Sequence, residues 1–102
     1  MYSALILPAA RQDVADSAQW YNGQQKGLGK RFTTQLREII KYARRNPRAF
    51  PVRYDDTRTA LMADFPFMIH YQLDENNHQI IVVAVLHTSR DSGVWTKQAD
   101  NE

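Results

Sequence analysis

The residues best suited to chemistry stand together where a long apolar run ends. His87 follows the apolar residues 80–86 directly, and Arg90 stands three positions further on. An imidazole can take or give a proton near neutral pH, and a guanidinium binds phosphate through a planar fork. Fixed polar groups at the end of a buried strand are a common way to build a site. The alternative interpretation is a simple polar exit from a strand.

Arg58 is a second basic candidate because it opens another strand pattern. If that strand neighbours the C-terminal hairpin, Arg58 lies on the same rim as His87. A histidine with arginines is a sensible minimum for RNA cleavage, since the imidazole takes the 2′-hydroxyl proton and guanidiniums stabilise the phosphorane. In the alternative, Arg58 or Arg90 pairs with Asp56 or Asp91 and holds the sheet edge together.

Other kinds of site find little support. The chain has no cysteine and no HExxH, and its three histidines share no helix-face spacing, so we expect neither a metal site nor a cofactor. His78 falls in a turn and is expected to be exposed, whereas His70 is expected to point to solvent or a groove. Residues 27–30, GLGK, lack the rest of a phosphate-binding loop.

Length and composition indicate one globular domain. The chain has 102 residues, of which 43% are hydrophobic and 24% charged. We expect a single domain over residues 1–96 and a flexible tail over residues 97–102. No stretch approaches the roughly 20 apolar residues of a membrane span, and no signal peptide is recognisable. The absence of cysteine also fits a reducing compartment, so we expect a cytoplasmic protein without membrane partners.

Charge is unevenly distributed along the chain. Residues 26–58 hold ten of the thirteen Lys and Arg and only three acids, a local net charge of +7 within an overall +2. A basic middle can attract an acidic partner or a phosphate backbone. The alternative is a solvated helix face.

Apolar periodicity predicts the order strand, helix, helix, strand, strand, strand. We expect strands near residues 2–7, 57–62, 67–73 and 80–86, helices near residues 9–24 and 28–45, and a connector over residues 46–56. The second helix carries an apolar stripe made of Leu28, Phe32, Leu36, Ile39, Ile40 and Ala43. The simplest arrangement is an α+β fold, with a helix hairpin on one face of a four-stranded, mostly antiparallel sheet. Trp20 is expected to be a core or inter-helix anchor, and Ile81, Val83 and Val85 are expected to be buried against the second helix.

Several short motifs, in this order and spacing, resemble the RelE/ParE superfamily of toxins from type II toxin–antitoxin systems, especially its ParE-like, plasmid-stabilisation branch. The match spans about residues 2–95 and implies the fold described above. The motifs are Trp20-Tyr21, Gly27-Leu28-Gly29, Arg31-Phe32, Asn46-Pro47, Phe50-Pro51, Arg58, Phe65-Pro66-Phe67, Ile69, Tyr71, residues 85–91 (VLHTSRD) and Trp95.

The resemblance implies a toxin that a small cognate antitoxin neutralises, with two alternative targets. ParE-like members poison DNA gyrase, whereas RelE-like members cleave mRNA on the ribosome with basic residues on the sheet and a C-terminal aromatic residue. The corresponding strand positions look like Thr59, Leu61 and Met68, and none of them is basic. We therefore favour gyrase inhibition over ribosome-dependent mRNA cleavage.

A ribonuclease would have to use His87, Arg90 and Arg58 as catalytic residues. Arg58, Arg90 and Trp95 are also the candidates for binding a target or a phosphate. A third interpretation is a decayed toxin that serves only as a binding partner of the antitoxin.

Overall fold

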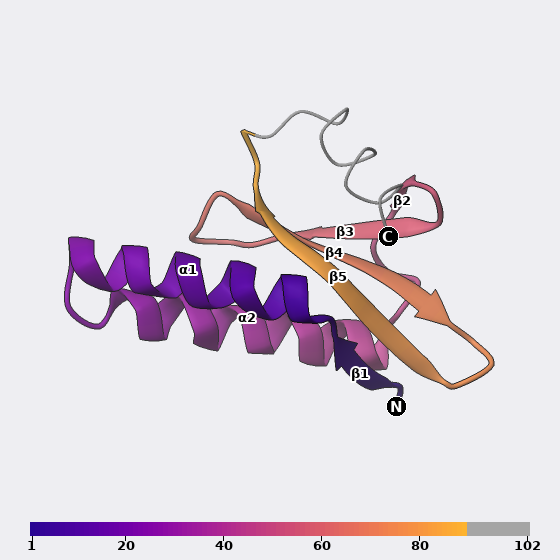
Figure 1. Cartoon of the computed structure of the whole chain (residues 1–102). Helices are drawn as coiled ribbons and strands as arrows, with labels where there is room; N and C mark the ends of the chain where they lie inside the picture. Colours follow the sequence, from indigo (N-terminus) through magenta and orange to yellow (C-terminus); the bar gives the residue numbers. More distant parts are fainter. Residues whose placement is uncertain (90–102) are drawn as a thin grey trace.

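A pair of helices covers one face of a five-stranded sheet in the computed structural model of this chain, which describes residues 1–89 (Figure 1). The sheet order is β1-β5-β4-β3-β2; β1 pairs parallel with β5, and the other neighbours are antiparallel. The α+β class and the helix hairpin are confirmed. The predicted tail at residues 97–102 lies outside the described residues. The elements are β1 (Ser3–Ile6), α1 (Pro8–Gln24), α2 (Leu28–Arg45), β2 (Val52–Tyr54), β3 (Thr57–Leu61), β4 (Phe67–Asp74) and β5 (Gln79–His87).

The predicted number of four strands was wrong, because the expected connector contains β2. This strand of three residues folds back on β3 through Asp55 and Asp56, whose φ angles are 43° and 61°. Two consecutive left-handed residues suit the tight turn of a hairpin, and aspartate tolerates that conformation better than most residues. Pairing then places Val52 opposite Arg58. A strand this short has no periodicity that a sequence pattern can reveal.

Strand β5 is central, as its apolar run predicts, but the predicted side of its residues was only partly right. Its register against β4 shifts between His70 and Tyr71, so that Val83 becomes an extra residue. Before the shift, Ile80 and Val82 pack into the cluster that contains the helices, and after it Val85 does so. Of the three residues expected to face the second helix, only Val85 lies on the face that the helices cover; Ile81 and Val83 lie on the opposite face. The extra residue at Val83 shifts which β5 side chains face the helices and which face away from them.

Helix α2 packs through the stripe that its sequence predicts. Phe32, Leu36 and Ala43 are buried, while Leu28, Ile39 and Ile40 pack against the same core from partly buried positions. Helix α2 ends at Arg45, just before Asn46-Pro47, because the residue before proline avoids helical backbone. Arg44 Nε donates to the Tyr2 carbonyl at 2.8 Å, and Tyr2 N–H donates to the Arg44 carbonyl at 2.9 Å. These bonds fasten the end of α2 to the start of the chain.

The two helices approach each other closely at Gly29. A Cβ atom built on Gly29 would lie 2.4 Å from the Ala18 carbonyl oxygen, which belongs to the backbone of α1. The turn before it uses Gly27 at φ 88°, and the Gly27 N–H donates to Asn22 Oδ1 at 3.0 Å. The missing side chain at Gly29 therefore permits the close packing of α1 on α2.

Replacing Gly29 should separate the helices. Gly29→Ala should lower the free energy of unfolding by about 1–3 kcal/mol, the usual cost of overpacking, because a backbone carbonyl cannot move aside as a side chain can. Urea denaturation followed by circular dichroism measures this. Gly23→Ala is the matched control, because nothing lies within 4 Å of its Cβ position. It should be neutral or stabilising, and an equal loss in both variants would contradict the proposed contact.

Candidate functional site

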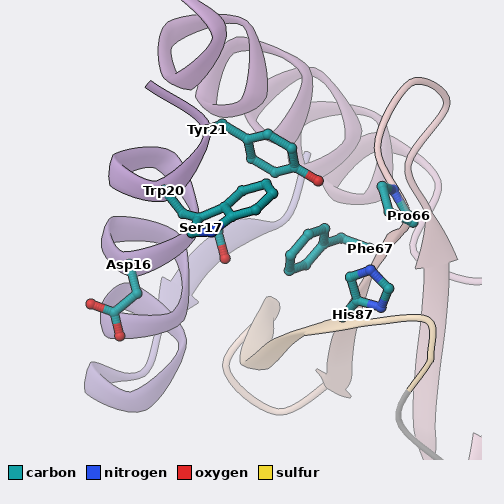
Figure 2. Close-up of a pocket in the computed structure, with 7 residues that line it drawn as sticks. All are labelled: Asp16, Ser17, Trp20, Tyr21, Pro66, Phe67 and His87. Atoms are coloured by element: carbon teal, nitrogen blue, oxygen red, sulfur yellow. The ribbon is translucent and has the colours of Figure 1, made fainter. Parts of the chain in front are cut away.

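A pocket of about 480 Å³ opens between the second half of α1 and the point where β4 begins and β5 ends. Its lining is largely aromatic. Figure 2 shows the rings of Trp20, Tyr21, Phe67 and His87 gathered around one space, with the Asp16 carboxylate directed away from them on the outer side of the helix. The lining residues are Asp16, Ser17, Trp20, Tyr21, Pro66, Phe67 and His87.

Helix α1 supplies four of these residues at helical spacing. Asp16 and Trp20 are four residues apart, as are Ser17 and Tyr21, so each pair lies one turn apart on one side of the helix. Tyr21 points inward, with ring centroids 4.8 Å from Phe65 and 5.0 Å from Trp20. Burial raises the pKa of its phenol. The neutral Tyr21 ring thus forms a fixed wall of the pocket.

Trp20 does not anchor the core, so that prediction was wrong. Its side chain is 60% exposed, whereas Tyr21 packs into the core cluster with Phe32. Neighbouring helix positions differ by about 100°, so only one of two consecutive aromatic residues can point inward. An exposed tryptophan has a large apolar body and a polar N–H, and such residues are enriched where proteins bind partners.

His87 ends β5 and lies in the pocket as an acceptor of a backbone hydrogen bond. Its ring meets Phe67 edge to face at a centroid distance of 5.2 Å. The Ser89 backbone N–H donates to His87 Nδ1 at 3.0 Å. A backbone N–H can only donate, so neutral His87 carries its proton on Nε2 in this arrangement. Its second nitrogen is then a hydrogen-bond donor, so action as a base at Nε2 would require the other tautomer and the loss of the Ser89 hydrogen bond.

Arg58 lies at a different part of the sheet from His87. It is opposite Tyr71 on β4, and Tyr71 is in turn opposite Val82 on β5. From there to His87 is five residues, roughly 16 Å of strand at about 3.3 Å per residue. Arg58 Nη1 instead donates to the Phe50 carbonyl at 2.7 Å. The guanidinium holds the segment after α2 in place, and the structure does not bring it together with His87.

The remaining sequence candidates, Arg90 and Trp95, lie outside residues 1–89, so their roles stay predictions. Among the described side chains, no cluster of three or more His, Asp or Glu is placed to hold a metal ion. No helix in the described part of the chain is long and apolar enough to cross a membrane.

Within residues 1–89, the charged side chains beside His87 are carboxylates. A second hollow of about 250 Å³ next to the aromatic pocket shares Asp16, Ser17, Phe67 and His87 with it and adds Asp13. Asp13 Oδ2 accepts a hydrogen bond from the Val85 backbone N–H at 3.0 Å, which fixes α1 to the end of β5. No Lys or Arg among the described residues lines either hollow.

Exposed basic residues gather instead on the outer side of α2. The sequence did not reveal that these basic residues lie apart from His87, because their position depends on which way α2 faces. Arg31 pairs with Asp64 at 3.2 Å, and Arg48 pairs with Glu75. The exposed basic side chains on this side of α2, called here the basic surface, are Lys30, Arg37, Lys41 and Arg45.

His70 is buried, contrary to the prediction that it points to solvent or a groove. It is fully covered on the sheet face opposite the helices, and its Nδ1 is hydrogen-bonded to the Tyr54 hydroxyl at 3.0 Å. Burial, helped by the positive charge of Arg53, lowers the pKa of His70 to about 4. His70 lines none of the pockets described here and serves the packing of the sheet. His78 is exposed, as predicted, and stacks on Tyr2.

Comparison with known proteins identifies the family. A model described as ParE toxin of type II toxin-antitoxin system, parDE, matches residues 5–92. The chain belongs to this family. No curated protein matches the sequence.

Solved toxin structures share the fold of this ParE-family chain. The isolated E. coli RelE toxin aligns over 99% of this chain and 98% of its own, with a TM-score of 0.68 and 16% identity. The chromosomal ParDE system from P. aeruginosa aligns over 87% of this chain and 98% of its own, with a TM-score of 0.64 and 13% identity. The RelBE2 toxin-antitoxin complex from Mycobacterium tuberculosis aligns over 84% of this chain and 96% of its own, with a TM-score of 0.61 and 18% identity. Structures at these identities establish the fold and leave the target open.

Buried His70 should make the stability of the ParE-family chain depend on pH. Its pKa of about 4 in the folded state lies below the ordinary value of 6.5, so the unfolded chain takes up the proton first. This contribution is present above pH 6.5 and is lost as the pH falls toward 4, by up to about 3 kcal/mol. Urea unfolding at pH 7 and pH 4.5 measures the loss.

The His70→Gln variant should lose less stability between these two pH values than the original chain. His78→Asn is the matched control, because it removes an exposed histidine at a turn whose φ of 52° asparagine tolerates. It should keep the full pH dependence. If His70→Gln kept the same pH dependence as the original chain, buried His70 would not be the source of the stability lost at low pH.

Proposed function

We propose that this ParE-family chain is a toxin that inhibits growth by binding DNA gyrase, and that a cognate antitoxin neutralises it. The observation that carries the proposal is the hydrogen bond of His87, the residue among positions 1–89 at the end of β5 that is best suited to acid–base chemistry. Its Nδ1 accepts the Ser89 N–H, so a reacting hydroxyl would have to displace this bond, or require the other tautomer, before His87 could take its proton.

As far as residues 1–89 show, the surroundings of His87 also disfavour cleavage of a phosphodiester. Such a reaction needs positive charge where the phosphorane forms. Arg58 is committed to the Phe50 carbonyl on another part of the sheet, and Asp16 lies beside the pocket. A toxin that acts by binding a protein does not need positive charge to stabilise a phosphorane.

Ribosome-dependent mRNA cleavage is the second candidate, and the similarity to E. coli RelE favours it to the extent that the fold is shared. The resemblance places basic residues of RelE-like enzymes at strand positions that hold Thr59, Leu61 and Met68 here. Thr59 is buried and Leu61 is 60% exposed. An exposed leucine can contact a protein but cannot neutralise a phosphate.

The antitoxin proposal rests on relatives and on charge. The similar solved structures include an E. coli RelBE toxin-antitoxin complex, a ParDE system and a RelBE2 complex. The basic surface on α2 can attract an acidic antitoxin segment that folds as it binds. Its attraction would act on the rate of association, which would fall as salt screens the charges.

Removing charge from the basic surface should slow association with the antitoxin. The double variant Arg37→Gln, Lys41→Gln should associate about threefold more slowly at low salt and depend less on salt. Stopped-flow fluorescence measures both. The matched control is Gln19→Glu with Gln25→Glu, which lowers the net charge by the same amount at exposed positions on or next to α1. Equal slowing in both would mean that net charge, rather than the basic surface, sets the rate.

Expression without antitoxin tests the target. His87→Gln should keep growth inhibition within about threefold of the original and should still induce the DNA-damage response, because binding needs no proton transfer. For a ribonuclease, the same change removes general-base action and costs on the order of a hundredfold. Reporters for DNA damage and for translation arrest distinguish the two.

Loss of toxicity in a His87→Gln protein that still folds and binds antitoxin, together with relief of translation arrest, would overturn the gyrase proposal. Absence of toxicity in the original chain would favour the decayed toxin.

A further inference from the structure

We propose that the aromatic pocket is a docking site for a protein segment that places an aromatic or long aliphatic side chain beside a lysine or arginine. This inference goes beyond the proposed function, because it holds whichever cellular target the toxin has. Its basis is the pocket lined by Trp20, Tyr21, Phe67 and His87, with Asp16 at its edge.

The pocket has the size and character of a binding site. Its volume of about 480 Å³ falls within the roughly 300–1,000 Å³ typical of sites that enclose a small group. Trp20 leaves 60% of its surface exposed at the pocket, although burying it would be favourable. A partner side chain that packs against Trp20 would remove that surface from water.

The walls of the pocket are fixed before anything binds. Tyr21 is held between Phe32 at 5.5 Å and Phe65 at 4.8 Å, measured between ring centroids. His87 is held by the Ser89 N–H and by the edge of Phe67. Binding to side chains that are already ordered loses little conformational entropy.

Charge selects the occupant. Asp16 lies one helical turn from Trp20, and no described Lys or Arg lines the pocket. The Asp16 carboxylate is directed to the outer side of α1 (Figure 2), so a guanidinium or ammonium would pair with it where the docked segment crosses α1, or would lie over the Trp20 ring. Among residues 1–89, the pocket lining offers a phosphate no positive charge. The pocket therefore fits a protein segment better than a nucleic acid.

The preferred charge is opposite to that of the basic surface on α2. There, Arg37 and Lys41 favour acidic segments, whereas Asp16 at the pocket favours basic ones. The two surfaces therefore recognise segments of different composition. An acidic antitoxin segment suits the first, and a basic segment carrying an aromatic residue suits the second.

Short peptides test this proposal on the full chain. The probes are acetyl-Gly-Phe-Arg-Gly-amide, the same peptide with Glu for Arg, the same peptide with Ala for Phe, and a single-stranded oligonucleotide. Binding is followed by the ¹⁵N-indole NMR signal of Trp20, which the Trp20→Phe variant distinguishes from that of Trp95. The Phe-Arg peptide should shift this signal and bind about fivefold more tightly than the other two peptides. The oligonucleotide should leave it unchanged.

Variants separate the two parts of the site. Asp16→Asn keeps the shape of the side chain and should remove most of the preference for Arg over Glu, while Phe still contributes. Trp20→Ala, at an exposed position that the fold does not need, should abolish binding. Because this variant lacks the Trp20 indole, its binding is monitored by the NMR signal of the Phe67 backbone amide. Gln19→Ala, an exposed neighbour outside the pocket, should bind as the original does.

Four results would overturn the proposal. They are no shift with any peptide up to its solubility limit, equal affinity for the Arg and Glu peptides, preference for the oligonucleotide, and tighter peptide binding by Trp95→Ala. The last result would assign the pocket to an aromatic residue of this chain rather than to a partner.

Discussion

The Tyr21 ring makes the contacts on which the arrangement of helices, sheet and pocket depends. It meets Phe32 of α2, Phe65 of the turn before β4 and Phe67 of β4, at centroid distances of 5.5, 4.8 and 6.1 Å. Each such pair contributes roughly 0.5–1.5 kcal/mol beyond simple burial. Phe67 in turn touches His87. A series of ring contacts thus runs from α2 to the end of β5, and it fixes the pocket wall as a consequence of core packing.

The elements with strong periodicity were predictable from the sequence. The stripe of α2 and the apolar run of β5 are long enough for the burial pattern to dominate. Strand β2 was not predictable, because three residues carry no period and their pairing depends on a turn at Asp55 and Asp56. The bulge at Val83 was hidden because every residue around it is apolar.

The site was less predictable because it depends on register and helix rotation. Sequence correctly placed His87 at the end of the central strand, but the distance between His87 and Arg58 follows from three strands aligned in register. The choice between Trp20 and Tyr21 as the buried residue depends on helix rotation by a single position. The sequence did contain one indication of the pocket, because Asp16 precedes Trp20-Tyr21 by one helical turn. This spacing indicates a surface site only when Trp20 is known to be exposed.

We propose that this toxin acts by binding a protein rather than by cleaving RNA. The most direct measurement is DNA supercoiling by purified gyrase in the presence of the purified toxin, with ATP and without ribosomes, beside an assay of mRNA on purified ribosomes. We expect supercoiling to stop as toxin is added, antitoxin to restore it, and the mRNA to stay intact. Unaffected supercoiling together with cleavage of ribosome-bound mRNA would contradict the claim.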